Sequence, residues 1–285
     1  MKASQAQIHP GVCIPVVHPN RAVATRPRAT ISVVIAGRNP GSHLVEMLDS
    51  LVDQVDPADE IIYYDDFSDD RSLEILKGYQ DRLPQLRIFS GKERLGVSAA
   101  RNRANALATS EYIAVLDSDD LFLKDTLLKY REMISKDRSL DFIFADTIVF
   151  NAHSGMRKRS HYPAFTNSHF PIATLMVRPV LPFKHSSVIY RRSMITEIGG
   201  YREDLPLKVD FEMIIRFIRS GGKMGKLDAV TSCHRTHAGQ MSRNRLKGIF
   251  SYWNIIELHE PRFIPAQLYK MLRCMGEIAK MAVGR

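Results

Sequence analysis

Apolar positions in the first half of the chain alternate between strand-like runs and helix-like spacing. The continuous, β-branched run at 31–37 predicts a strand that is covered on both faces. The segment 42–54 then places apolar residues at helical spacing behind Ser42, a suitable N-cap. The alternation continues with strands expected at 60–66, 86–91 and 112–117 and helices at 71–79 and 98–110. This order predicts an α/β fold with a parallel sheet and helices on both faces.

The second half of the chain follows a less regular pattern. It predicts, in order, a helix at 126–136, a strand at 141–150, a polar loop region at 156–172, a strand, helix and glycine turn at 186–204, a helix at 210–222, a strand at 223–237 and a helical tail from Leu246. The first residues show no periodicity and should form an extended arm. We therefore divide the chain into an arm (1–29), two halves of one domain (30–140 and 141–243) and a helical C-terminal tail (244–285).

Composition and cysteine usage narrow the class of protein. The 285 residues are 45% hydrophobic and 25% charged, which is typical of a globular protein. The three cysteines, Cys13, Cys233 and Cys274, are far apart and form no CxxC motif, so neither a disulfide framework nor a zinc site is indicated. No apolar run approaches the ~18 residues that cross a bilayer, and the first thirty residues make a poor signal peptide. We expect a cytoplasmic protein.

The charge balance is basic. Forty Lys and Arg against 31 Asp and Glu give a net charge of +9, which suits nucleic acid, an anionic membrane face or a phosphorylated substrate, or is simply a soluble surface. The first half contains no stripe of basic residues interleaved with aromatics, so we do not expect a nucleic-acid-binding protein.

Polar side chains follow the predicted strands where each strand ends. In parallel sheets ligands bind beyond the carboxyl ends of the strands, so these residues should line one crevice. They are Arg38, Asn39, Asp65, Asp66 and the acids Asp117, Asp119 and Asp120. No GxGxxG, GxxxxGK[ST], GxSxG or HExxH motif is present, which argues against a dinucleotide fold, a P-loop, a serine hydrolase elbow and a zinc protease.

The acidic triplet after the fourth strand is either a solvated turn or a cation site. Asp117 and Asp119 share one face because alternate residues of an extended chain point the same way. Neighbouring carboxylates raise each other's pKa unless a positive charge lies among them. Hard oxygen ligands of this kind suit Mn²⁺ or Mg²⁺, so we favour a divalent cation.

Several segments taken in order resemble the family 2 glycosyltransferases of the GT-A fold. They are ISVVIAGRNPGSHLVEMLDSLVDQ, EIIYYDDFSDDRSLEIL, GVSAARNRANALATSEYIAVLDSDD, HSSVIYRRSMITEIGGYRED, VDFEMIIRFI and HRTHAGQMS. The resemblance covers about 30–243 and implies a Rossmann-like, mostly parallel sheet with a nucleotide-sugar-binding half at 30–140 and an acceptor-binding half at 141–243. It also implies inverting transfer of a sugar from a nucleotide diphosphate sugar, most often UDP-linked. The acceptor would be a glycan or lipid-linked molecule, as in polysaccharide biosynthesis.

The same resemblance implies roles for individual residues. The donor would be bound by Gly37, Asn39, Asp65, Asp66, Arg101, Asp117 and Ser118. The divalent metal, Mn²⁺ or Mg²⁺, would be held by Asp119 with Asp117 and His237, with Asp120 in support. Asp210 would be the general base, with Glu212 as the fallback. The structural alternatives are that Asp65 and Asp66 shape a turn, that Asp210 caps a helix and that His237 is structural.

Three residues depart from the family pattern and keep other functions open. Arg38 replaces an aromatic residue before Asn39, Phe67 stands where the turn has glycine, and Val209 replaces the first acid of the catalytic pair. The alternatives are a non-catalytic nucleotide-binding module of the same fold and a metal-dependent nucleotidyltransferase. The basic, aromatic tail either contacts an anionic membrane from the cytoplasmic side or packs on the core or a second subunit. The oligomeric state is not predicted.

Overall fold

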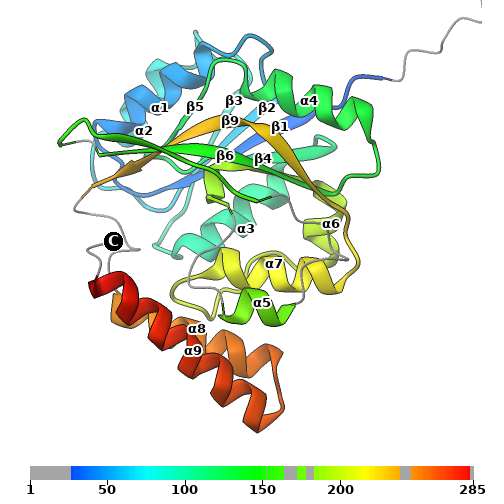
Figure 1. The fold of residues 1–285 in the computed structure, drawn as a ribbon. Helices are drawn as coiled ribbons and strands as arrows, with labels where there is room; N and C mark the ends of the chain where they lie inside the picture. Colours follow the sequence, from blue (N-terminus) through cyan, green and yellow to red (C-terminus); the bar gives the residue numbers. More distant parts are fainter. Residues whose placement is uncertain (1–26, 152, 164–171, 178–182, 238–244, 283–285) are drawn as a thin grey trace, which may run out of the picture.

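Strands and helices alternate through the first half of the chain, as the sequence predicts (Figure 1). The computed structural model describes residues 27–151, 153–163, 172–177, 183–237 and 245–282. The strands are β1 (Ile31–Gly37), β2 (Glu60–Asp65), β3 (Leu86–Ser90), β4 (Tyr112–Val115), β5 (Leu121–Phe122), β6 (Phe142–Asn151), β7 (Arg157–Ser160), β8 (Val188–Arg191) and β9 (Met224–Thr236). The helices are α1 (His43–Val52), α2 (Ser72–Gly78), α3 (Val97–Leu107), α4 (Thr126–Lys136), α5 (Ile172–Val177), the 3₁₀ turn η1 (His185–Ser187), α6 (Arg192–Glu197), α7 (Val209–Arg219), α8 (Arg245–His259) and α9 (Phe263–Ala282).

All of these strands belong to one sheet, in the order β3-β2-β1-β4-β8-β6-β9-β5, with β7 paired to β6. The first four strands are parallel, and β1 lies between β2 and β4. Strand β8 joins the halves by pairing antiparallel with both β4 and β6. The long strand β9 runs parallel to β6 and returns the chain to β5, directly after the acidic triplet. The carboxyl ends of β1, β2 and β4 therefore share an edge with segments from the second half.

Two hydrophobic cores lie on the two faces of the sheet. Along β1, Val33 and Ile35 face one core while Val34 faces the other, as the two-residue period of a strand requires. The first core packs against α1, α2 and α4, and the second against α3, α6 and α7, on the opposite side (Figure 1). Burial on both faces explains why these strands appear in the sequence as continuous apolar runs.

The sequence prediction was wrong for part of the second half. The region 156–172, expected to be a polar loop, contains strand β7, which pairs antiparallel with β6. Its residues Arg157, Lys158 and Arg159 are exposed, so no apolar alternation marks it as a strand. Charged side chains on a sheet edge prevent pairing with other chains, which gives this basic run a structural reason. The mostly parallel sheet that the resemblance implies is confirmed, and the antiparallel pairs involve β5, β7 and β8.

The predicted C-terminal tail forms two adjacent helices, α8 and α9, joined by a short connection (Figure 1). Tyr252 of α8 packs edge-on against Phe211 of α7, with ring centroids 5.1 Å apart. The guanidinium of Arg273 from α9 lies 3.4 Å from the ring centroid of Tyr252. The tail thus packs on the domain through aromatic contacts. None of the described helices has the length and hydropathy needed to span a membrane. The expected arm, 1–29, lies almost entirely outside the described residues.

Candidate active site

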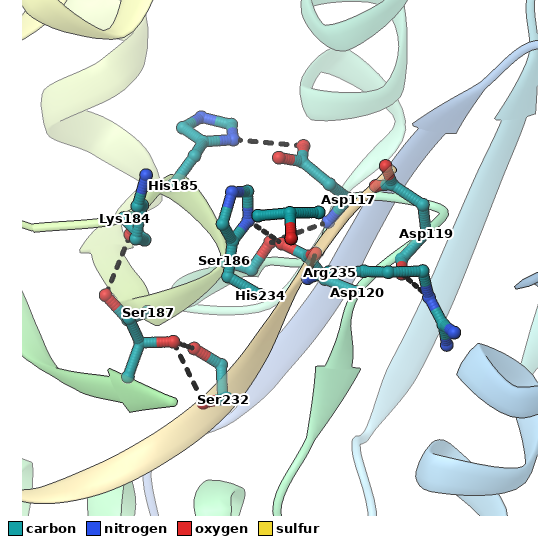
Figure 2. Close-up of polar contacts among 12 residues, drawn as sticks. Asp117, Asp119, Asp120, Lys184, His185, Ser186, Ser187, Ser232, His234 and Arg235 are labelled. Carbon is teal, nitrogen blue, oxygen red and sulfur yellow. Dashed lines mark hydrogen bonds and ion pairs between the residues drawn. The ribbon is translucent and has the colours of Figure 1, made fainter. Parts of the chain in front are cut away.

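The three acids after β4 point in different directions, although they are nearly consecutive in the chain. A turn closes after the strand, with the backbone N–H of Asp120 donating to the carbonyl of Asp117 at 3.0 Å. Figure 2 shows the carboxylate of Asp117 directed toward His185, whereas Asp119 lies on the other side of the turn. The turn therefore separates the three carboxylates into three local environments.

Asp117 is neutralised by neighbouring side chains. Its Oδ1 accepts a hydrogen bond from Arg101 Nη2 at 2.6 Å and lies 3.3 Å from His185 Nδ1. Burial alone would raise the pKa of Asp117, but Arg101 and then His185 outweigh it and hold the pKa well below its usual range. Asp117 is therefore a carboxylate at neutral pH. The ion pair joins α3 to the end of β4.

Asp120 anchors the turn. Its side chain is fully buried and accepts from Ser186 Oγ at 2.5 Å and from the backbone N–H of Arg235 at 2.8 Å. His234 Nδ1 lies 3.0 Å from the same carboxylate (Figure 2). These partners belong to η1 and β9, so Asp120 ties the turn to the second half of the domain.

Asp119 is the acid whose charge is least compensated. Its Oδ2 lies 2.9 Å from His237 Nε2, and a quarter of its side chain is exposed. Burial, followed by the charges of Asp120 and Asp117, raises the pKa of Asp119. A cation beside this carboxylate would relieve that unfavourable charge. A carboxylate oxygen and an imidazole nitrogen are also ligands that Mn²⁺ accepts, so the pair fits a divalent metal.

The loops after β1 and β2 are joined by side-chain hydrogen bonds. Asn39 Nδ2 donates to Asp69 Oδ1 at 2.6 Å, and the backbone N–H of Asp69 donates back to Asn39 Oδ1 at 3.0 Å. Arg38 Nε donates to the carbonyl of Phe67 at 3.3 Å. Phe67 has φ 60°, a conformation that favours glycine, so the turn keeps a glycine-like backbone in spite of its phenyl ring.

Asp65 and Asp66 both shape the loops at the end of β2. Asp65 is fully buried and its Oδ2 accepts from the backbone N–H of Ser68 at 3.0 Å, whereas its Oδ1 has no hydrogen-bond partner among the described residues. Asp66 accepts from the backbone N–H groups of Leu95 and Gly96, at 2.7 and 2.9 Å, just before α3. These contacts agree with the turn-shaping interpretation, and nucleotide-sugar binding by either residue stays a prediction.

Gly37 lies directly against the acidic turn. A Cβ built on Gly37 would come within 2.8 Å of Ser118 Cβ and 2.3 Å of Tyr63 Oη. This close packing explains why the position between β1 and the loop carries no side chain. It also places Gly37 and Ser118, both expected to be near the donor, in contact.

The two acids at the start of α7 have different surroundings. Asp210 is half-buried, and its charge acts on Arg101 and Tyr201. Glu212 is fully buried, with Arg216 Nη2 at 2.6 Å and His259 Nε2 at 3.1 Å from its carboxylate. Burial would raise the pKa of Glu212, but the hydrogen bonds and charges of His259 and Arg216 outweigh this effect and lower the pKa. We therefore assign Glu212 to the packing of α7 rather than to proton transfer.

Residues 32–199 match the family model described as Glycosyl transferase family 2, which is more than half of the chain. The chain belongs to glycosyl transferase family 2. The match spans the acidic turn, α3 and β8 of this family 2 glycosyltransferase.

Named relatives of this family 2 glycosyltransferase come from different organisms. An uncharacterized glycosyltransferase of Methanocaldococcus jannaschii is 25% identical, over 79% of this chain and 78% of the relative. An amylovoran biosynthesis glycosyltransferase of Erwinia amylovora is 24% identical, over 89% of this chain and 95% of the relative.

Solved structures show that the family 2 chain has a GT-A fold. The S. aureus protein TarS in complex with UDP-GlcNAc superposes with a TM-score of 0.66 at 20% identity, covering 80% of this chain and 65% of that one. GalNAc-T7 with UDP, GalNAc and Mn²⁺ gives 0.62 at 18% identity, covering 81% of this chain and 48% of that one. The chain therefore spans less than two thirds of either structure, and the likeness concerns the fold.

A second group of metal-capable side chains in the glycosyltransferase, within the described ranges, lies away from the acidic turn. Asp146, His161 and Asp228 offer ligand atoms within 4.8 Å of one another. Asp146, however, pairs with Arg159 at 2.8 Å and Lys226 at 3.3 Å. Despite burial, hydrogen bonds from the Tyr162 backbone and these side chains hold its pKa at about 2. Two cations already balance this carboxylate, so we interpret the group as a charge cluster.

The sequence analysis missed the buried polar residues of η1. His185 lies between Asp117 and Tyr201, with its Nε2 2.8 Å from Tyr201 Oη, and Ser186 Oγ accepts from the backbone N–H of Asp117 at 3.1 Å. The sequence pattern predicts a strand from Ser186 and a family motif over HSSVIYRRSMITEIGGYRED, but it assigns no role to His185 or Ser186. The available signal was a run of polar residues directly before a buried strand, but its partners lie about seventy positions earlier, beyond any local pattern.

Proposed function

We propose that the protein is an inverting glycosyltransferase that moves a sugar from a nucleotide diphosphate sugar, with uridine as the base, to a hydroxyl of a glycan or lipid-linked acceptor. The observation that carries the proposal is the juxtaposition of Asp119 and His237 beside the neutralised Asp117. An uncompensated carboxylate with an imidazole partner, at the carboxyl edge of a parallel sheet, suits a metal–diphosphate site.

The donor side is assigned to the loops that end β1, β2 and β4. Asp119 and His237 would hold a divalent ion, Mn²⁺ or Mg²⁺, which supplies charge neutralisation for the departing diphosphate. Arg101, fixed by Asp117, adds a positive charge at the same edge of the sheet. The remaining donor contacts are assigned to the loop residues Gly37, Asn39, Asp65, Asp66 and Ser118.

The acceptor side is assigned to the start of α7. Asp210 would accept the proton of the acceptor hydroxyl as the sugar is transferred. Val209, which replaces the first acid of the family's pair, is 3% exposed and packs in the core. Asp210 is half-buried at the start of α7, and its negative charge acts on Arg101, which supports its assignment as the base.

The test is thermal unfolding with a panel of nucleoside diphosphates, with and without Mn²⁺, for the wild type and Asp119→Ala. A ligand at a hundredfold excess over its Kd adds about 2.7 kcal/mol of stability. We expect UDP to raise the Tm only when Mn²⁺ and Asp119 are both present, and we call this rise in Tm the UDP shift. Asp228→Ala, in the charge cluster, is the matched control and should keep the shift. Absence of any shift in the wild type would refute the donor site.

A transfer assay separates catalysis from binding alone. A glycosyltransferase is supported if the wild type hydrolyses UDP-sugars or transfers their sugar. The Asp210→Asn variant should lose this activity but keep the UDP shift. A UDP shift without turnover on any sugar acceptor supports the non-catalytic nucleotide-binding module instead. Release of pyrophosphate from a nucleoside triphosphate and a sugar phosphate would identify a nucleotidyltransferase.

A further inference from the structure

The outward face of α9 is apolar and exposed. We call the residues Ile264, Leu268, Met271, Met275 and Ile278 the α9 stripe. They are between 46% and 79% exposed. Helix α9 lies with α8 at the end of the molecule away from α1 and α2 (Figure 1). No described residue covers the stripe, and so large a set of exposed apolar side chains on one helix marks an interaction site.

The spacing of the α9 stripe matches that of a helix seam. Its residues are separated by four, three, four and three positions, the repeat that keeps one narrow face of a helix against a partner helix. Leu272 widens the face on one side and is 38% exposed. A stripe with this period is complementary to another helix with the same period.

Two charged residues of α9 whose side chains the structure describes, Lys270 and Arg273, lie on the opposite, inward side. Arg273 is fully buried against Tyr252, and Lys270 is 8% exposed, close to Glu257 and the Trp253 ring. Helices that bind anionic lipid surfaces instead present Lys and Arg beside their apolar face. At the edge of the α9 stripe the helical wheel places Gln267 and Cys274, which are uncharged. The helix therefore favours an apolar protein partner over a lipid headgroup layer.

We propose that the α9 stripe is the contact surface of a homodimer, in which α9 packs against the same helix of a second copy of this chain across a twofold axis. A two-fold contact uses the same patch on both copies, and an uncharged apolar stripe meets this condition without like-charge repulsion. This inference is independent of the proposed sugar transfer.

The exposed area is sufficient for such a contact. A helix of 20 residues is about 30 Å long. On the neighbouring helix α8, Leu246 and Phe250 are also 71% and 58% exposed. At on the order of 100 Å² for each fully buried aliphatic side chain, these residues would give a symmetric pair on the order of 1,000 Å² of buried surface, the lower bound for a specific interface.

Sedimentation velocity over a wide range of protein concentrations tests the proposal. The wild type should convert from monomer to dimer as concentration rises. Met271→Glu places a charge in the centre of the α9 stripe and should raise the dimer Kd by about a hundredfold or more. Met156→Glu introduces the same charge at a 71% exposed methionine outside the α8 and α9 helices and should leave the Kd unchanged.

Three outcomes would overturn the homodimer. The wild type could remain a monomer at every concentration, or Met271→Glu could dimerise as well as Met156→Glu. A monomeric wild type that sediments with phosphatidylglycerol vesicles would assign the stripe to a lipid surface instead. If Met271→Glu fails to fold, as judged by circular dichroism, the concentration dependence of the wild type still decides.

Discussion

His237 Nε2 lies 2.9 Å from Asp119 Oδ2, although 118 positions separate the two residues in the chain. Strand β9 makes this contact, because its antiparallel pairing with β5 sets Leu121 opposite Cys233. His237, the residue directly after β9, is thereby brought to the acidic turn. One candidate metal ligand thus comes from each half of the domain, and the position of β9 decides whether the pair forms.

Replacing Asp119 with asparagine should stabilise the ligand-free protein while removing its response to metal. The raised pKa of Asp119 means that the folded protein disfavours its charge at neutral pH. Removing that charge should raise the free energy of unfolding, which is seen as a rise in Tm. The Mn²⁺-dependent UDP shift should be lost. Asp228→Asn, at an 87% exposed side chain, should change neither quantity. A lower Tm for Asp119→Asn would contradict this account.

The stability difference between the wild type and Asp119→Asn should depend on pH. A raised pKa means that the unfavourable charge of Asp119 is absent below the ordinary value of 3.8 and complete above the folded-state pKa. The advantage of Asp119→Asn should therefore grow as pH rises through this window. Denaturant unfolding of both proteins over a pH series measures it. Affinity for Mn²⁺ and UDP should strengthen in the same direction, since the metal needs the carboxylate. A constant difference at all pH values would count against the raised pKa.

Replacing Asp210 with asparagine should reduce turnover without loss of donor binding. General base catalysis contributes about 10²- to 10⁴-fold in rate, so kcat should fall by that factor. The KM for the donor, the UDP shift and the Tm should stay near wild type. Asp204→Asn, a mostly exposed acid shortly before α7, is the matched control and should retain full activity. Equal activity in both variants would remove Asp210 from the mechanism.

Replacing Glu212 with glutamine should lower stability rather than catalysis. The change removes the negative partner of Arg216 and His259 from a buried cluster, which costs about 3 kcal/mol or more. Because the pKa of Glu212 is lowered, its stabilising effect is present above the ordinary value of 4.5 and is lost as pH falls. Chemical denaturation at neutral pH measures the loss. If Glu212→Gln instead abolished turnover at an unchanged Tm, Glu212 would be the base.

Adding a methyl group at Gly37 should disturb the acidic turn. A Cβ there would meet Ser118 and Tyr63 at distances that force them to move, at a cost of about 1–3 kcal/mol. The Mn²⁺-dependent affinity for UDP should fall as the turn shifts. Gly78→Ala is the control, because a Cβ on Gly78 has no neighbour within 4 Å and should be neutral or slightly stabilising. Wild-type UDP affinity in Gly37→Ala would show that the turn does not depend on this packing.

The sequence by itself determined the α/β core and the location of the acidic turn. The run 31–37 became β1 with the predicted bounds, because a strand buried on both faces has to be apolar throughout. The turn was found because three acids directly follow a buried strand, and β4 does end there. Both features follow from local patterns, because the burial of a strand or helix determines the order of apolar and polar residues along it.

Only the tertiary structure decided how the three acids divide their roles. Arg101 and His185 neutralise Asp117, Ser186 and His234 bind Asp120, and Asp119 is left with His237. The sequence fixes which residues are charged, but the energy of each charge depends on partners that are distant in the chain and on local burial. The basic strand β7 and the inward Arg273 were hidden for a related reason. Charged side chains do not predict a strand or a buried helix face in the sequence. The pairing of β7 with β6 and the contact of Arg273 with Tyr252 are defined only by the tertiary structure.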